Sequence, residues 1–198
     1  MTKLILDQKA LNQLFFEAHT CNAWQDKPVP DDLLHQLYDV FRLAPTSMNC
    51  SPARIVFVKS VEAKQKLNPA LMEGNRAKTM NAPVTAIIAY DTKFFEHLPK
   101  LFPPIPDARE MFERDASLAD MTAFRNGSLQ GAYLILAARA LGLDCGPMSG
   151  FNNEMVDQQF FSGTHVKSNF LCNLGYGDAK GFHPRNRKLT FDEACSIV

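Results

Sequence analysis

The stretch Ala44–Val58, APTSMNCSPARIVFV, predicts the end of a helix, then a polar turn, then a strand. Pro45 offers no N–H and its ring crowds the preceding turn, so it ends the helix before it. Pro52 forces Ser51 into an extended conformation and introduces IVFV, a β-branched run suited to a buried strand. Between the two prolines lie small side chains with hydroxyl or amide groups: Thr46, Ser47, Asn49 and Ser51.

This polar turn has two interpretations. A polar loop fixed between two apolar elements can present donors and acceptors to a planar ligand. An ordinary helix-to-strand connection would also be rich in turn-forming residues. The turn taken alone favours neither.

Length and composition indicate one globular domain over residues 1–198, of which 46% are hydrophobic. Lys+Arg and Asp+Glu both number 21, so no net field favours nucleic acid or a membrane surface. The longest apolar run, Ala132–Leu143, is too short to span a bilayer and contains Arg139. We expect no nucleic-acid and no membrane partner.

Five cysteines, odd in number and widely spaced, fit reduced thiols better than a disulfide framework. The N-terminus lacks the basic patch and apolar core of a signal peptide. These features predict a cytoplasmic protein. The five histidines lack ligand spacing, so we expect no metal, and we interpret Cys50 and Cys145 as small buried fillers.

Apolar periodicity predicts helices over 8–18, from Asp31 to Ala44 and over 117–141, and strands over 54–60, 84–90 and 168–176. Ser60 is expected to cap a short helix, and Thr190 with Glu193 a final one. CGPMSGF, 145–151, is interpreted as a loop. The second half of the 117–141 helix is apolar nearly all round and is expected to be buried on every side, either at the centre of the domain or in a dimer interface.

Residues 91–115 form an irregular but apolar excursion, with four prolines from Pro99 to Pro106. Long irregular segments in compact domains are often lids or binding loops. Exposed aromatic side chains there would cover a substrate or pack on a neighbouring subunit. We treat the excursion as a candidate lid.

Several motifs, taken in order, resemble the FMN-dependent nitroreductase family. They are HTCNAWQDKPVP (19–30), PTSMNCSP (45–52), NRAK (75–78), ALGLD (140–144), GPMSGF (146–151) and the LGYG…RNRKL segment within 174–189. NCSPAR, FRNGSLQGAY and CGPMSGF are similar to the branch of malonic semialdehyde reductases of pyrimidine utilisation. The resemblance covers almost the whole chain.

This resemblance implies an α+β, nitroreductase-like fold: a central mixed sheet flanked by helices, in an intertwined homodimer with FMN between the subunits. NADH or NADPH would reduce flavin N5, and a small acceptor would then take the electrons, with malonic semialdehyde yielding 3-hydroxypropionate. The alternatives are a general nitroaromatic, quinone or flavin reductase, and a flavin-binding protein without turnover. No side chain is expected as catalytic acid or base, and Lys78 would support N5 as the reacting centre.

The resemblance also implies where the flavin binds. His19, Thr20 and Asn22 would meet the phosphate, although His19 and Asn22 stand where the family usually has arginine. Arg185 and Arg187 alternate, so in an extended segment they would point the same way and clamp the phosphate. By composition alone, these residues would read as a helix end and a solvated basic turn.

The remaining cofactor-binding residues would surround the ring. Asn75 and Lys78, three apart on one helical face, would meet the pyrimidine edge, where the ammonium stabilises negative charge. Backbone N–H groups of Ser149 and Gly150 would point at N5 and O4, and an amide at Asn126 would approach the flavin. The full set adds these residues of the two loops: Pro45, Thr46, Ser47, Asn49, Pro147 and Met148.

Overall fold

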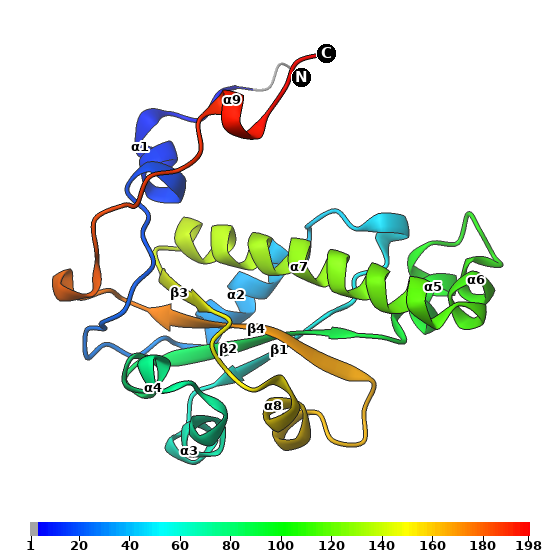
Figure 1. The fold of residues 1–198 in the computed structure, drawn as a ribbon, viewed down its shortest axis with the longest axis horizontal. Coiled ribbons are helices and arrows are strands. Elements are labelled where there is room, and N and C mark those ends of the chain that lie inside the picture. Colours follow the sequence, from blue (N-terminus) through cyan, green and yellow to red (C-terminus); the bar gives the residue numbers. More distant parts are fainter. Residues whose placement is uncertain (1–3) are drawn as a thin grey trace.

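The fold is built on one four-stranded sheet with the strand order β1-β2-β4-β3, in which every neighbouring pair runs antiparallel (Figure 1). The structure is a computed structural model that describes residues 4–198. Its strands are β1 (Ala53–Val58), β2 (Val84–Asp91), β3 (Asp144–Met148) and β4 (Val166–Gly175). Among the described residues, the parallel pairing of the expected mixed sheet is limited to an isolated bridge between Thr20 and Cys145.

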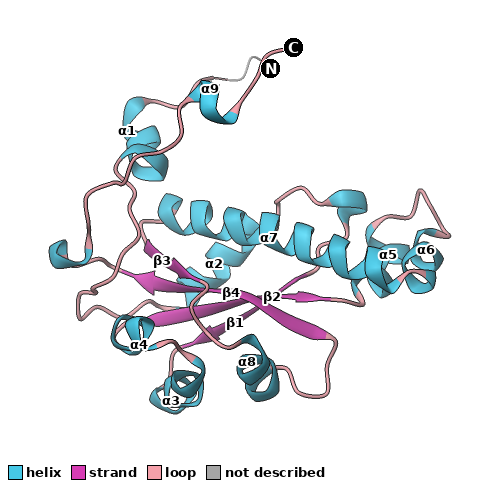
Figure 2. Ribbon diagram, viewed as in Figure 1, coloured by secondary structure: helices cyan, strands magenta, loops and turns pink. Residues whose placement is uncertain are grey.

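Helices cover both faces of the sheet (Figure 2). On one face lie α2 (Asp31–Phe41) and α7 (Ala116–Ala140), and on the other α3 (Val61–Leu67), α4 (Glu73–Met80) and α8 (Asn153–Phe160). Alternate residues of β2 point to opposite faces, so Ala86 and Ile88 join the core under α2 and α7. Ile87 and Ala89 join the core under α3 and α8. The α+β expectation is therefore confirmed.

The helices begin where local capping signals predict. Ser60 Oγ accepts a hydrogen bond from the Ala63 N–H at 3.1 Å, which starts α3. Asn152 caps α8 in the same way. Thr190 and Glu193 form the predicted capping box of α9 (Phe191–Ala194).

One side of α7 is exposed, so burial on every side is wrong for the single chain. Leu134 is buried against the sheet, whereas Leu129 and Tyr133 remain 46% and 40% exposed. Met121 and Phe124, each about half exposed, continue this apolar strip of α7 (Met121, Phe124, Leu129, Tyr133) along the helix. The helix is therefore not enclosed at the centre of the domain, and its place in a dimer interface stays a prediction.

Residues 91–115 are more regular than expected. They form a 3-10 turn (Phe94–His97) and the short helices α5 (Leu98–Leu101) and α6 (Ala108–Arg114). Phe94, Phe95 and Phe112 are buried in a separate cluster with Cys50 of the polar turn and Ala123 of α7. The aromatic side chains therefore stabilise the excursion itself and do not form an exposed cover.

Residues 145–151, expected as a loop, contain most of β3. The backbone pairs with β4, with Gly146 opposite Asn173. As an edge strand, β3 tolerates Pro147, which has no N–H for a second neighbour. The chain turns only after Met148, through Ser149 and Gly150.

The N-terminal and C-terminal segments leave the sheet together (Figure 1). The regular helix expected over 8–18 is instead α1 (Gln8–Leu11) followed by a π-helical turn (Asn12–Phe16). Arg185 Nη2 donates to the carbonyls of Phe15, Phe16 and Ala18 at 3.0, 3.0 and 2.9 Å, and so ties the segments to each other. Exposed apolar residues mark both segments: Leu4, Ile5, Leu189 and Phe191.

Candidate functional site

The candidate residues gather in two places. Half-site A comprises His19, Thr20, Asn22, Asn75, Lys78, Pro147–Gly150 and Arg185. Half-site B comprises Pro45–Asn49 together with Asn126. In one chain, half-site A lies around α4, the end of β3 and the terminal segments, and half-site B lies beside the first half of α7 near α5 (Figure 1).

In half-site A, Asn75 packs directly on the backbone after β3. Its Nδ2 donates to the Gly150 carbonyl at 2.8 Å. A Cβ on Gly150 would lie 2.4 Å from that nitrogen and 3.3 Å from Met72 Sδ, so this close approach requires glycine. The Asn75 side chain thereby fixes the backbone that follows β3 against α4.

Lys78 and Asn22 join the N-terminal part of half-site A to α4. Lys78 Nζ donates to Asn22 Oδ1 at 3.2 Å, and Asn22 Nδ2 donates to the Gly181 carbonyl at 3.3 Å. Trp24 Nε1 donates to the Lys78 carbonyl at 3.0 Å and fixes the last turn of α4. The amide at position 22, where arginine is typical of the family, therefore positions the lysine.

A cationic cavity of about 390 Å³ adjoins Asn22. Its lining is Ala18, His19, Thr20, Asn22, Arg139, His183, Pro184, Arg185, Asn186 and Lys188, among which there is no acidic residue. His19 Nδ1 lies 3.0 Å from the His183 carbonyl, and since a carbonyl only accepts, Nδ1 carries the hydrogen. Three fixed positive charges in an acid-free cavity suit a phosphate.

Arg185 and Arg187 do not point the same way. Arg185 lines the cavity, while Arg187 donates to both carboxylate oxygens of Glu193 at 3.0 and 3.2 Å. The capping box of α9 holds that carboxylate and so draws Arg187 away. Sequence reasoning did not assign Arg139 or Lys188 to the site: Arg139 lies in a helix that reads as apolar, and Lys188 within a basic turn.

Half-site B is a strained turn. Met48, Asn49 and Ser51 have φ values of 52°, 51° and 42°, in the left-handed region that non-glycine residues rarely adopt. The extended conformation expected for Ser51 before Pro52 is therefore wrong, because the turn holds this residue in the left-handed region. Each such residue costs on the order of 1–3 kcal/mol unless the surroundings hold it. Strain of this kind concentrates at functional sites, which favours the ligand-binding interpretation of the polar turn.

Two buried amides on α7 hold this turn. Asn126 Oδ1 accepts from the Ser47 N–H and Gln130 Oε1 accepts from the Ala53 N–H, both at 2.9 Å. Asn126 Nδ2 donates to the Thr122 carbonyl at 2.8 Å, and the side chain is 1% exposed. Both the oxygen and the nitrogen of the Asn126 amide are thus hydrogen-bonded within the chain. Asn126 therefore supports the turn. Contact with a flavin stays a prediction.

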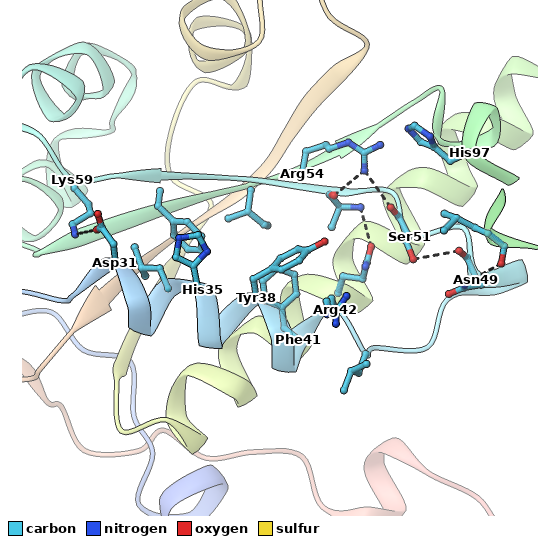
Figure 3. A pocket seen from close by; sticks show the side chains of 17 residues that line it. Asp31, His35, Tyr38, Phe41, Arg42, Asn49, Ser51, Arg54, Lys59 and His97 are labelled. Atoms are coloured by element: carbon cyan, nitrogen blue, oxygen red, sulfur yellow. Dashed lines mark hydrogen bonds and ion pairs between the residues drawn. The ribbon is translucent and has the colours of Figure 1, made fainter.

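A large cavity, of about 1010 Å³, lies between α2 and the edge strand β1 and reaches half-site B at Asn49 (Figure 3). Tyr38 and His35 of α2 point into this cavity, and Arg54 and His97 lie on its other side. Arg54 Nη2 pairs with Asp91 Oδ2 at 2.7 Å, and Nη1 donates to the Ser51 carbonyl at 3.2 Å. Arg54 therefore buttresses the strained turn.

The buried thiols are poor nucleophiles. Burial raises the pKa of Cys50 and of Cys21 to about 11, so both stay protonated near neutral pH. This supports the interpretation of Cys50 as a buried filler, and Cys145 is likewise buried. Within residues 4–198, no cluster of histidine, cysteine and carboxylate side chains has the geometry of a metal site. In the same range, no helix is long and apolar enough to cross a bilayer.

Fold and site together define an α+β protein with an acid-free cationic cavity whose lining residue Asn22 is hydrogen-bonded to Lys78 of α4. The sequence profile of the Nitroreductase family matches residues 17–176, which is most of the chain, so the protein belongs to the nitroreductase family. Arg185 and Lys188 lie beyond the matched range.

Two relatives and one solved structure illustrate this kinship. The chain is 62% identical to a Burkholderia lata protein over 97% of this chain and 98% of that one. It is 56% identical to HadB of Ralstonia pickettii over 96% and 97%. Both relatives are provisionally named NADH dehydrogenase/NAD(P)H nitroreductase. A nitroreductase-like structure from Exiguobacterium sibiricum in complex with FMN superimposes with a TM-score of 0.85 at 19% identity, covering all of both chains.

Proposed function

We propose that this protein is an FMN-dependent NAD(P)H oxidoreductase that works as a homodimer and passes hydride through flavin N5 to a small acceptor. The observation that carries the proposal is half-site A, where Asn22 lines an acid-free cationic cavity and accepts a hydrogen bond from Lys78, and where Asn75 of the same helix holds the Gly150 carbonyl. FMN is chemically complementary to this half-site, because it has an anionic tail and a planar ring with polar groups along its edge. The names of the relatives and the FMN in the structural neighbour support the same cofactors.

Bound FMN would supply the redox chemistry, accepting a hydride at N5 and then delivering it to a second substrate. The residues of this chain would bind the flavin and polarise its ring. Arg139, Arg185 and Lys188 would hold the phosphate. The Lys78 ammonium would stabilise negative charge on the pyrimidine side, and the N–H groups of Ser149 and Gly150 would orient the ring.

The separation of the half-sites supports a dimeric site. A twofold axis would place half-site B of one subunit against half-site A of the other, giving two equivalent sites. The apolar strip of α7 and the apolar residues of the terminal segments supply surface that the single chain leaves uncovered. In this arrangement the excursion at 91–115 would lie against the site as a fixed wall or lid, since His97 and Leu101 line the large cavity.

The proposed physiological acceptor is malonic semialdehyde, reduced to 3-hydroxypropionate. A carboxylate acceptor requires a cation, and the guanidinium groups of the large cavity are already paired: Arg54 with Asp91 and Arg42 with Asp39. That pairing, and the relatives' names, favour nitroaromatic or quinone reduction as the second candidate. His97 of the 91–115 excursion also lines this cavity.

The test is a pair of half-reactions on the purified protein. Flavin released from it should be FMN, and anaerobic NADH or NADPH should bleach the bound form. Stopped-flow reoxidation by malonic semialdehyde, a quinone and a nitroarene then ranks the acceptors, and we expect malonic semialdehyde to be fastest. A faster quinone or nitroarene reaction supports the general reductase.

Two further outcomes count against the proposal. Colourless protein that FMN cannot reconstitute excludes the cofactor. Yellow protein that neither nicotinamide bleaches indicates a flavin-binding protein without turnover, which is consistent with the missing arginines at positions 19 and 22.

A further inference from the structure

Lys64 of α3 is a buried lysine, 4% exposed, on a helix whose other lysine, Lys66, is exposed. Its Nζ donates to the Thr79 carbonyl at 2.8 Å and to Thr85 Oγ1 at 2.5 Å. Within residues 4–198 no carboxylate forms an ion pair with it. An unpaired ammonium in a protein interior is costly, and methionine would fill similar space without that cost.

A chain of buried hydrogen bonds starts at Lys64. Thr85 Oγ1 of β2 donates to Asn173 Oδ1 of β4 at 2.7 Å. Asn173 Nδ2 in turn donates to the Lys78 carbonyl and to Thr79 Oγ1, both at 3.3 Å. Thr79, Thr85 and Asn173 are completely buried, so water does not screen this network.

This hydrogen-bond network reaches the elements that carry half-site A. Lys78 and Thr79 belong to the last turn of α4, and Thr79 Oγ1 donates to Met148 Sδ, the end of β3, at 3.4 Å. The Lys64 ammonium lies against a carbonyl at the C-terminal end of α4, where the helix carries partial negative charge. Lys64 therefore contacts α4, which carries Asn75 and Lys78, and it is connected to the end of β3 through Thr79.

We propose that Lys64 is a positioning residue of the flavin site, whose buried positive charge clamps α4 to the sheet and favours the reduced, more negative state of the bound flavin. This rests on the proposed function. The charge acts through a low-dielectric interior, where its influence extends further than at the surface. The hydrogen bonds fix the Lys78 backbone from which the neighbouring ammonium projects.

Lys64 changes its protonation state close to neutral pH. Burial lowers its pKa from 10.5 to about 7. The charged side chains on the elements around it are Glu62 and Lys66 of α3, Glu73, Arg76 and Lys78 of α4, Asp91 of β2, Lys167 of β4, and Glu154 and Asp157 of α8. Negative charge added to half-site A on reduction would raise the Lys64 pKa, so that reduction draws a proton to it.

The test compares Lys64→Met and Lys64→Gln with Lys66→Met, which removes the same charge from the exposed side of α3. We expect FMN to bind roughly tenfold more weakly to the two Lys64 variants, as for the loss of one or two buried hydrogen bonds. Their flavin midpoint potential should be more negative than that of the parent at about pH 6, and this gap should close towards about pH 9 as the parent loses its Lys64 proton. Lys66→Met should follow the parent.

Lys64→Gln keeps a donor but cannot ionise, so it separates charge from hydrogen bonding. A gap between Lys64→Gln and the parent that is constant with pH, or no gap, overturns the role of the charge. If FMN binds and is reduced but the potentials coincide, the inference about Lys64 fails while the proposed function stands. If no FMN binds at all, the proposed function fails first.

A second measurement on the full-length chain freed of flavin needs no turnover. Because the folded pKa lies below the unfolded one, the unfolded chain binds more protons between about pH 7 and 10.5. The stability of the parent relative to Lys64→Met should therefore rise with pH in that window, by at most roughly tenfold in the unfolding constant per pH unit, since the raised thiol pKa values of Cys21 and Cys50 act equally on both chains. Lys66→Met should show the same rise relative to Lys64→Met; stability curves of the parent and Lys64→Met that run parallel with pH contradict the buried charge.

Discussion

Lys188 gives the cleanest residue-scale test of the cationic cavity. It is exposed, lines the cavity and takes no part in the ion pairs of the described residues. Lys188→Met should weaken FMN binding by roughly tenfold, as expected for one partly screened phosphate contact, with the melting temperature unchanged. Flavin fluorescence titration measures this.

Two control variants test whether the loss of FMN binding is specific to the cavity. Lys180→Met removes an exposed lysine outside the cavity lining, and Arg187→Ala removes a guanidinium already paired with Glu193. Both should bind FMN as the parent does. Equal losses in all three variants would indicate a diffuse electrostatic effect and no phosphate site at the cavity.

Lys78 is predicted to act on the chemistry more than on binding. Lys78→Met should retain FMN but slow its reduction by NADH or NADPH by about ten- to a hundredfold, because negative charge on the ring loses its ammonium partner. Anaerobic stopped-flow absorbance reports the rate. An unchanged half-reaction would remove Lys78 from the mechanism.

At the residue scale, sequence reasoning found residues that sit in recognisable motifs and missed those that only tertiary contact brings together. Thr20 and Asn22 line one cavity and Lys78 is hydrogen-bonded to Asn22, while their role in flavin binding stays a prediction. Arg139 could not be found because it lies within an apparently apolar run. In the sequence, Lys64 looks like another solvated lysine of an amphipathic helix. Only the structure shows that it lies on the buried face of α3.

Among the elements, the turn of half-site B depends on α7. Asn126→Leu leaves the Ser47 N–H without its acceptor beside a strained turn, so the free energy of unfolding should fall by about 1–3 kcal/mol. Urea denaturation checks the loss, with the exposed Arg125→Gln on the same helix as the control. Equal stability of the two variants would show that the turn holds its conformation without α7.

Patterns of side chains predicted the elements that have their own signal. The β-branched runs of β1 and β2, the Ser60 cap and the Thr190–Glu193 capping box all have local causes. β3 has none, because DCGPM lacks β-branched residues and contains glycine and proline. It is a strand because β4 supplies partners for its backbone. The sheet-forming half of CGPMSGF was therefore missed.

The whole molecule is proposed to contain two sites, each with half-site A from one subunit and half-site B from the other. Lys78→Met damages one half and Asn126→Leu the other. Mixed, dissociated and reassociated in equal amounts, these variants should form about one quarter intact sites, since about half the dimers are mixed and each has one undamaged site. NAD(P)H oxidation should rise accordingly above either parent variant.

A mixture whose rate stays at the mean of the two variants would place both halves of the site within one chain. The same sample before dissociation is the control, because unexchanged dimers contain no intact site. Size-exclusion chromatography of each variant confirms that both still associate.

The cationic cavity has a consequence for biosynthesis. Apart from Arg139, its walls come from residues 18–22 and residues 183–188, with the entire sheet between them in the sequence. A nascent polypeptide can build β1, β2 and β4 while the cradle for the anion still lacks one wall. Cofactor loading would thus follow translation of the last strand, and prematurely terminated products would emerge folded in part but colourless.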